Sequence, residues 1–443
     1  MASRELNIWS NGQLLGVWSW TRTGTHSLTY ADSWLVSSQA RALSLSLPIT
    51  AGAKEVRGAV VKNFFDNLLP DNQQMRERVR AQYALDSTDT QELLRAIGRD
   101  CVGAIQLLPD GMTPDGYNEV HSTALDEADV EKTLNSVRGG AVLGNGGDDD
   151  HDFRISIAGA QEKTALLKIG EQWHRPHDAT PTTHILKLPL GLVGNMQADM
   201  SSSVENEWLC ARIMAALGFD VAATSMARFG SQKVLVVQRF DRRWADGGSW
   251  IVRLPQEDLC QASGIPVQKK YERDGGPGIQ QCLALLASSA KADHDRLAFA
   301  LANLAFWLLA ATDGHAKNFS IFLHAGGSHS MTPLYDILSV WPIIGKGSKQ
   351  LMRQKVKLAM AIRSKNAHYE LDKIQTRHWL VVARQSGVDG AFEAMKSLVE
   401  QVAPALDTVE KELPENFPAQ VWDSIRNGML TQKTRFQAGL EST

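Results

Sequence analysis

Short runs of alternating hydrophobic and polar residues recur through roughly the first half of the chain, and this period of two predicts strands. Asn11-Gly12 lies between two such runs and predicts a hairpin, because both residues tolerate a positive φ. Alternation over residues 43–47, ended by a proline, predicts another strand. Residues 73–84 and 91–97 have the spacing of short helices. The first half is therefore predicted to mix strands and helices.

Near residue 240 the apolar residues change to the spacing of helices. Helices are predicted over residues 279–289, 295–311, 368–386, 390–401 and 419–428. The change predicts an α+β protein with a mixed α/β N-terminal lobe over 1–238 and an all-helical C-terminal lobe over 239–443. Within the first lobe, residues 1–110 and 151–238 are expected to form separate parts, because a stretch rich in glycine and aspartate lies between them.

Composition narrows the class of protein. At 443 residues the chain is too long for one ordinary core. A hydrophobic content of 43% and a net charge of -3 describe a globular protein with no overall attraction to nucleic acid. The four cysteines are scattered, which favours free thiols in a reducing cytoplasm. The longest apolar run, residues 297–311, is shorter than a membrane span, so a cytoplasmic protein is expected.

The polar loop 313–318 follows a predicted buried helix and precedes a short apolar segment. Burying so many polar groups is unfavourable unless they meet a ligand. Asp313 with Asn318 five positions later matches the catalytic loop of protein kinases, where the Asp accepts the proton of the attacking hydroxyl and the Asn holds Mg²⁺ on ATP. Asp336, 18 residues beyond Asn318, suits a second metal ligand. The spacing therefore predicts phosphoryl transfer.

Two upstream features suit the phosphates of a nucleotide. Small residues at 158–160 form a turn between two predicted strands, which would let backbone N–H groups approach phosphate oxygens. Lys187 lies in an apolar strand, where an ammonium group is unfavourable unless it meets an anion. Ser202–Glu205 has the pattern of a capping box at the start of a helix. Either Glu205 or Glu207 of that helix could pair with Lys187, and the choice stays open.

Six stretches of the chain carry a further signal: residues 64–70, 156–163, 184–187, 238–241, 313–318 and 333–336. Together they resemble the HipA family, serine/threonine-kinase toxins of bacterial type II toxin–antitoxin systems. Their order and spacing match the family over nearly the whole chain. The resemblance implies a protein-kinase-like fold of two lobes, in agreement with the boundary expected near residue 240, and residues 151–238 would then form the nucleotide-binding part.

The resemblance also implies a role for individual residues. Asp313 would be the catalytic base, Asn318 and Asp336 would bind Mg²⁺, and Ser156 would be the site of autophosphorylation. The implied ATP-binding residues are Ala158, Gly159, Ala160, Gln161, Glu162, Lys163, Lys187, Gln238, Arg239, Phe240, His315, Ala316, Lys317, Asn318, Tyr335 and Asp336. Gln238 departs from the glutamate common at this hinge position. Because an amide oxygen still accepts from the adenine amino group, weaker selectivity is expected rather than loss of binding.

The family's partners are carried over in the same way. The resemblance implies a HipB-like helix-turn-helix antitoxin, an operator DNA repressed by the complex, and a protein substrate among the aminoacyl-tRNA synthetases, such as glutamyl-tRNA synthetase. Phosphorylation of that substrate would arrest growth and favour persistence. Candidate DNA contacts are a basic cluster after the active site and one later arginine: Lys346, Lys349, Arg353, Lys355, Lys357 and Arg384. Without the resemblance, a solvated face would be the better interpretation of this cluster.

Three alternatives remain at this stage. A small-molecule phosphotransferase of the aminoglycoside-kinase type would use the same acidic residues but lacks stretches 64–70 and 156–163 in this form. A repressor-partner module without catalysis would not need to retain Lys187 and Asp313. A metal hydrolase built from Asp313, His315, His324 and Asp336 lacks a recognised ligand spacing.

Overall fold

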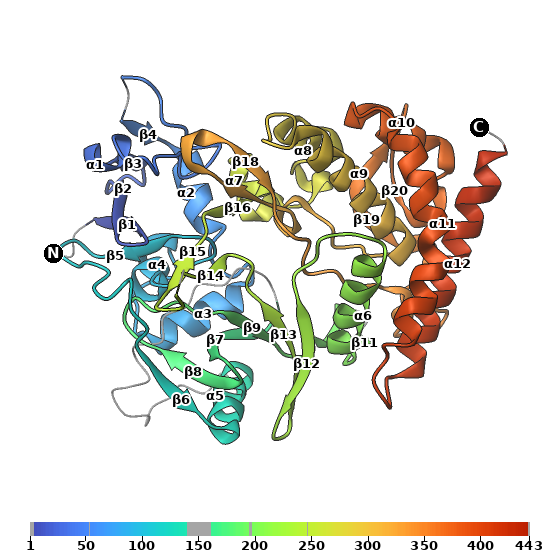
Figure 1. The fold of residues 1–443 in the computed structure, drawn as a ribbon, viewed down its shortest axis with the longest axis horizontal. Coiled ribbons are helices and arrows are strands. Elements are labelled where there is room, and N and C mark those ends of the chain that lie inside the picture. The colour runs from blue at the N-terminus through green and yellow to red at the C-terminus, as the bar shows by residue number, and fades with distance from the viewer. Residues whose placement is uncertain (1–3, 53, 140–160, 195–196, 246, 442–443) are drawn as a thin grey trace. The chain divides into compact units, whose positions relative to one another are not determined.

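The computed structural model describes residues 4–52, 54–139, 161–194, 197–245 and 247–441 (Figure 1). Ser156 and the predicted phosphate-loop residues 158–160 lie outside this part. By its contacts the chain forms two units. Unit 1 contains Met1–Leu188, Ala227–Gln268 and Ile321–His329, and unit 2 contains Pro189–Met226, Lys269–Ser320 and Ser330–Thr443. The lobe boundary proposed at 238 lies inside the second segment of unit 1.

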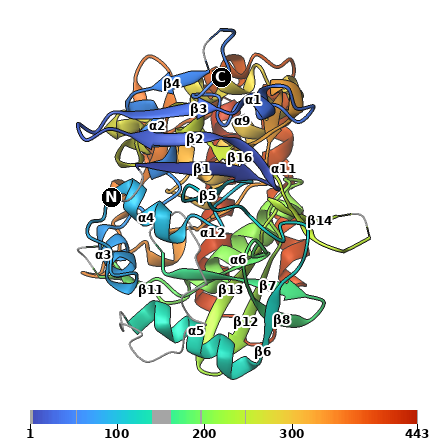
Figure 2. The ribbon, with the colours of Figure 1, turned by 90° about the vertical axis from the view of Figure 1, so that its left-hand side faces the viewer.

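Unit 1 begins with a five-stranded sheet (Figure 2). Its strands, in the order β4-β3-β2-β1-β5, are Glu55–Arg57, His26–Tyr30, Gln13–Trp20, Glu5–Ser10 and Gln106–Leu108. Asn11 and Gly12 both have positive φ, at 46° and 78°, which confirms the predicted hairpin between β1 and β2. Helices α2 (Ala59–Asp66), α3 (Gln73–Gln82) and α4 (Thr90–Ile97) follow. Trp18 stacks on Phe65 with ring centroids 4.0 Å apart, so the sheet and α2 share one core.

The strand predicted over residues 43–47 is wrong. This segment forms only an isolated bridge between Ser44 and Leu47. Leu43 and Leu47 are buried, while the Ser44 and Ser46 hydroxyl groups donate to the carbonyl of Gln261 at 3.3 and 2.7 Å. Alternation therefore arises here from a loop that turns alternate side chains to an apolar core and to a polar neighbour, without sheet pairing.

A buried carboxyl group anchors the same loop. Glu257 is 0% exposed, and one of its oxygens accepts from the Leu45 N–H at 2.8 Å. Burial raises the pKa of Glu257 to about 8, and the nearby Asp258 carboxylate adds to the shift. Glu257 is therefore protonated in the folded protein at neutral pH.

Replacing Glu257 by Gln should change how stability depends on pH. Between a pH of about 4.3 and 8, the unfolded chain releases the proton of Glu257 while the folded chain keeps it, so stability falls by up to about 1.4 kcal/mol per pH unit. Glutamine keeps the shape and cannot ionise. We expect Glu257→Gln to match the parent below pH 4 and to exceed its stability increasingly up to pH 8. Urea midpoints measured over this range test it, with the exposed Glu415→Gln as control. Parallel pH profiles for parent and Glu257→Gln would contradict the assignment.

A second sheet of unit 1 has the order β12-β13-β9-β7-β8-β6. These strands are Thr224–Phe229, Gln232–Gln238, His184–Lys187, Lys163–Ile169, Gln172–Pro176 and Ser122–Leu125. Helix α5 (Glu127–Gly139) contributes Val130 and Leu134 to a core with Leu166 and Leu186. The sheet holds the lysine strand that the sequence singled out.

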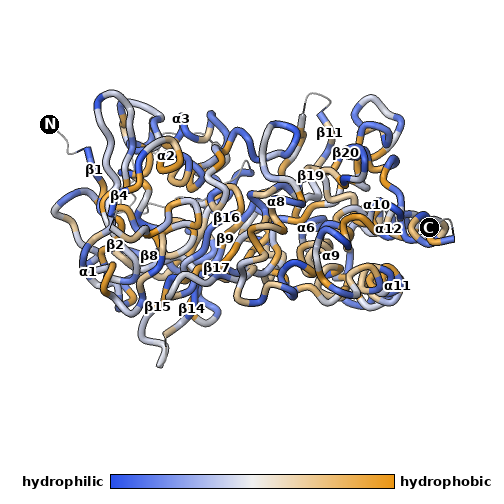
Figure 3. Tube along the Cα trace, turned by 90° about the horizontal axis from the view of Figure 1, so that it is seen from above, coloured by the Kyte–Doolittle hydropathy of each residue, from blue (hydrophilic) through white to orange (hydrophobic). Residues whose placement is uncertain are grey.

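Unit 2 contains the long helices. They are α6 (Ser203–Ala216), α8 (Ile279–Leu286), α9 (Ala292–Leu309), α10 (Thr376–Ser386), α11 (Ala391–Glu410) and α12 (Ala419–Leu440). Helix α9 is buried along nearly its whole second half, and its hydrophobic residues are visible in Figure 3. It ends at Leu309, and the next residue, Ala310, has a φ of 47° that turns the chain toward the predicted catalytic loop. None of the described helices is long and apolar enough to cross a membrane.

The prediction of an all-helical segment after residue 239 is wrong. Strands also occur there: Arg242–Trp244 (β14), Ile251–Arg253 (β15), Gln256–Asp258 (β16), Ser320–Leu323 (β17), His329–Met331 (β18), Lys357–Arg363 (β19) and Ala367–Glu370 (β20). Most are too short to show a period of two. Strand β19 buries five consecutive residues, and such a run cannot be distinguished from a helix by its pattern.

The capping box predicted at Ser202–Glu205 is also wrong. Ser202 is the N-cap residue of α6, but its side chain makes no capping hydrogen bond.

Candidate active site

Two lysines lie opposite each other in unit 1. Strand β7 pairs with β9 so that Lys163 is the direct partner of Lys187. Directly opposite residues project from the same face of a sheet, and like charges in such a pair repel. Lys187 is nevertheless 5% exposed. A phosphate oxygen on this face of the sheet would meet both ammonium groups, which form charge-assisted hydrogen bonds with phosphate.

Gln161 and Glu162 tie the chain before β7 to the neighbouring strand. The Gln161 side-chain amide donates to the carbonyl of Leu188 at 2.6 Å, and the Leu188 N–H donates to the carbonyl of Glu162 at 3.0 Å. The Glu162 carboxylate forms an ion pair with Arg78 of α3 at 2.7 Å. These contacts fix Gln161 and Glu162, the described end of the predicted phosphate loop.

The predicted hinge begins at the end of β13. Gln238 is exposed and pairs with His184 through the backbone. The Arg239 N–H donates to the carbonyl of Thr183 at 2.9 Å, and its side chain is 4% exposed. Phe240 packs edge-on against Phe322, with centroids 5.9 Å apart. The Arg239 guanidinium is thus directed into the protein, where Asp100 and Asp241 bind it.

Arg239 belongs to a buried ionic cluster, defined here as Asp100, Arg239, Asp241, Arg242 and Arg253. Arg239 donates to Asp241 at 3.0 and 2.8 Å and to Asp100 at 3.2 Å. Arg242 and Arg253 reach Asp100 at 2.9 and 3.3 Å. Burial alone would raise the pKa of Asp100, but the three arginines hold it well below its usual value. The cluster joins the first subdomain to the hinge, and its spread over distant positions gave no signal in the sequence.

In unit 2 the predicted catalytic loop closes on itself. The carbonyl of Asp313 accepts from the His315 N–H at 2.8 Å and from the Asn318 side-chain amide at 2.7 Å. A Cβ on Gly314 would lie 2.4 Å from the Phe306 ring, so only glycine fits between the loop and α9. His315, Lys317 and Asn318 are 2%, 6% and 7% exposed. The structure therefore brings the predicted residues of this loop together in a fixed form.

Asp313 differs from its neighbours because its side chain is 54% exposed. It lies 3.7 Å from the His315 imidazole. It also accepts a hydrogen bond from the Tyr271 hydroxyl at 2.5 Å. A fixed loop with one exposed carboxylate is the geometry that a general base requires. Tyr271 was missed at the sequence level because it lies in an irregular segment 42 residues earlier.

The predicted metal-binding segment is connected to this loop by Tyr335. Its hydroxyl donates to the carbonyl of Lys317 at 3.0 Å and is 2.6 Å from the Ser320 hydroxyl. Asp336 has a φ of 59°, a conformation that non-glycine residues adopt mainly in turns and at functional sites. Because the Asn318 side-chain nitrogen is used within the loop, its oxygen is the atom suited to a cation. Two hard oxygen donors fit Mg²⁺, which keeps water and phosphate as its other ligands.

The metal-hydrolase alternative finds no support. Among the residues that the structure describes, no group of three or more His, Cys, Asp or Glu side chains could hold a metal ion.

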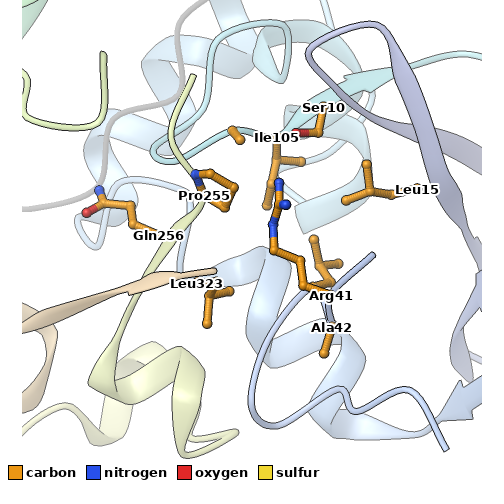
Figure 4. A pocket seen from close by; sticks show the side chains of 10 residues that line it. Ser10, Leu15, Arg41, Ala42, Ile105, Pro255, Gln256 and Leu323 are labelled. Atoms are coloured by element: carbon orange, nitrogen blue, oxygen red, sulfur yellow. The ribbon is translucent and has the colours of Figure 1, made fainter. Parts of the chain in front are cut away.

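The pocket in Figure 4 lies away from the predicted site. None of the predicted site residues lines it, and Arg41 extends toward Ile105 between mostly apolar walls. Burial lowers the pKa of Arg41 to about 10, so it stays charged.

Two family models match most of the chain. Residues 155–409 match the model of the HipA-like C-terminal domain, and residues 6–108 match that of the HipA N-terminal domain. The Sinorhizobium fredii protein Y4mE is 32% identical over 423 residues, covering 94% of each chain. The serine/threonine-protein kinase toxin HipA of Shewanella oneidensis is 30% identical over 330 residues, covering 71% of this chain and 70% of that protein.

A solved structure has the same fold. It is the Shewanella oneidensis complex of HipA, HipB and operator DNA, with a TM-score of 0.79 and 23% identity, covering 99% of this chain and 98% of that one. The match to the HipA-like C-terminal domain, residues 155–409, includes Lys187, Asp313 and Asp336. The chain therefore belongs to the HipA family of serine/threonine-protein kinase toxins.

Proposed function

We propose that Asp313 is the general base of an ATP- and Mg²⁺-dependent transfer to a serine or threonine hydroxyl. The observation that carries this role is the exposed Asp313 carboxylate on an otherwise buried, closed loop. Bound Mg²⁺ would neutralise charge that develops on the phosphates. Asp313 accepts the proton of the acceptor hydroxyl as that oxygen bonds to the γ-phosphorus and the bond to the β-phosphate breaks.

The remaining ATP contacts belong to the same proposal. The ammonium groups of Lys163 and Lys187 pair with phosphate oxygens. Backbone N–H groups of the phosphate loop contact the same phosphates; the loop residues are Ala158, Gly159, Ala160, Gln161 and Glu162. Gln238, Arg239 and Phe240 contact adenine, with Arg239 acting through its carbonyl. His315, Ala316, Lys317 and Tyr335 line the phosphate side. Support comes from the opposed lysines and from the closed loop 313–318.

The metal ligands give a separate prediction. Asn318→Ala and Asp336→Ala should each weaken MgATP binding by about tenfold or more, because each removes one oxygen ligand from a hard cation. Calorimetric titration of MgATP tests both variants, and titration of ATP with excess chelator isolates the metal-dependent part. Lys365→Ala, a change at an exposed position, is the control. Parent-like MgATP affinity in both variants would eliminate the two-ligand site.

The biological setting is proposed from the resemblance and from the solved relative, which binds HipB and its operator DNA. The chain would bind a HipB-like antitoxin in the cytoplasm and repress its own operator with it. Its protein substrate would be an aminoacyl-tRNA synthetase such as glutamyl-tRNA synthetase, whose phosphorylation arrests growth and promotes persistence. Autophosphorylation would occur at Ser156.

Two residues of the basic cluster proposed for DNA contacts lie close to acidic side chains. Arg353 pairs with Asp372 at 2.9 Å, and Lys357 lies 3.5 Å from Glu370. Their charges are partly neutralised by these acids. Lys346, Lys349 and Lys355, all exposed, are therefore better candidates for phosphate contacts.

One experiment tests the function as a whole. The protein is incubated with γ-labelled MgATP and cell lysate, and the labelled products are identified, with Asp313→Ala as control. We expect label on one main lysate protein and on Ser156 of the kinase, and none with Asp313→Ala. Label only on small molecules would favour the phosphotransferase alternative. No transfer by the folded parent would favour the repressor-partner module, and either result would overturn the proposal.

A further inference from the structure

Tyr271 contacts the predicted base directly. Its hydroxyl donates to Oδ1 of Asp313 at 2.5 Å, and both residues belong to unit 2. The Tyr271 ring meets the His315 ring edge-on, with centroids 4.9 Å apart and planes at 80°. The phenol thus bridges the carboxylate and the buried imidazole of the same loop.

The segment that carries Tyr271 is fixed on the following side. The Glu272 carboxylate, whose side chain is 6% exposed, accepts from the Ala361 N–H at 2.6 Å and from Arg363 Nε at 2.8 Å. The carbonyl of Tyr271 accepts from the N–H groups of Asp274 and Gly276, each at 3.0 Å. Strand β19 therefore holds this segment through Glu272, the residue next to Tyr271.

We propose that Tyr271 is a positioning residue for phosphoryl transfer, an inference that rests on the proposed role of Asp313. An exposed carboxylate can rotate about both of its side-chain bonds, which spreads it over orientations that do not meet the acceptor. The Tyr271 hydroxyl holds Oδ1 and leaves Oδ2 to accept the proton of the acceptor hydroxyl. Tyr271 keeps its own proton throughout the step.

Tyr271→Phe tests this role, because it removes the hydroxyl and keeps the ring against His315. The readout is the rate of label transfer from γ-labelled MgATP to lysate protein over a range of ATP concentrations. We expect kcat to fall by about tenfold or more, the scale of one hydrogen bond to a charged group, with KM for ATP and the melting temperature unchanged. A residue that only stabilises the fold would not give this split. Tyr369→Phe, on β20 of the same unit, is the matched control and should keep the parent rate.

A double variant sharpens the result. In the Asp313→Ala background, Tyr271→Phe should cause no further loss, because a residue that acts through Asp313 has nothing left to position. Parent-like kcat in Tyr271→Phe, or an equal further loss in the Asp313→Ala background, would overturn the role of Tyr271 while leaving Asp313 as the base. A parent no faster than Asp313→Ala would instead overturn the proposed function itself.

Discussion

Asp313→Ala is expected to reduce phosphoryl transfer by at least about 10²–10⁴-fold, the usual contribution of a positioned general base. Alanine removes the group that accepts the proton. The carbonyl of residue 313 accepts from the His315 N–H and from the Asn318 side-chain amide, so these hydrogen bonds close the loop without the Asp313 side chain. Because the carboxylate is exposed, its loss leaves no cavity and should change the melting temperature little.

The measurement is single-turnover transfer from γ-labelled MgATP, together with the melting curve and MgATP affinity of each variant. Asp389→Ala, at an exposed position of unit 2, is the matched control for removal of a surface carboxylate. The expected pattern is a folded Asp313→Ala protein that binds MgATP and transfers almost no phosphate. Transfer at the parent rate would remove Asp313 from the chemistry.

Asp100→Ala should cause the largest loss of stability, about 3–5 kcal/mol, the typical effect of removing one partner from a buried ionic group. Asp100 contacts three arginines of the ionic cluster, and Arg253 has no other carboxylate among its described ion pairs. After the change, Arg253 would remain buried without a carboxylate, and Arg239 and Arg242 would share Asp241 alone.

Urea unfolding of the parent, Asp100→Ala and Asp100→Asn tests this expectation. The matched control is Asp32→Ala, because Asp32 and Lys54 form a surface pair with 77% and 58% of their side chains exposed, and such pairs contribute about 0–1 kcal/mol. Asp100→Asn keeps the side chain's shape and separates the loss of charge from the loss of packing. A similar small effect for Asp100→Ala and Asp32→Ala would show that the cluster does not hold the hinge.

Stretch 64–70 served as a signal of the family, but in the structure its polar residues have a structural role. Asp66 pairs with Arg76 at 2.8 Å and accepts from Thr90 at 2.7 Å. The Asn67 amide donates to the carbonyl of Ile265 at 2.9 Å. Without neighbours in space, these residues could not be told apart from ligand-binding ones.

The sequence by itself determined the features that depend on neighbours along the chain. Asn11-Gly12 specified its hairpin because turn conformation is a local property. Helix α9 was recognisable from its length and apolar content, and loop 313–318 from polar residues within six positions. These predictions needed only short-range periodicity and the chemistry of adjacent side chains.

Tertiary structure decided what depends on distant partners. It made a loop of residues 43–47 by placing their serines against Gln261, and it made a strand of the apolar residues of β19. It also places the Tyr271 hydroxyl against the Asp313 carboxylate and brings the residues of the ionic cluster into contact. Burial in the folded chain raises the pKa of Glu257. Hydrogen bonds and charges act through space, and burial sets their strength, so no local pattern in the chain encodes these pairings.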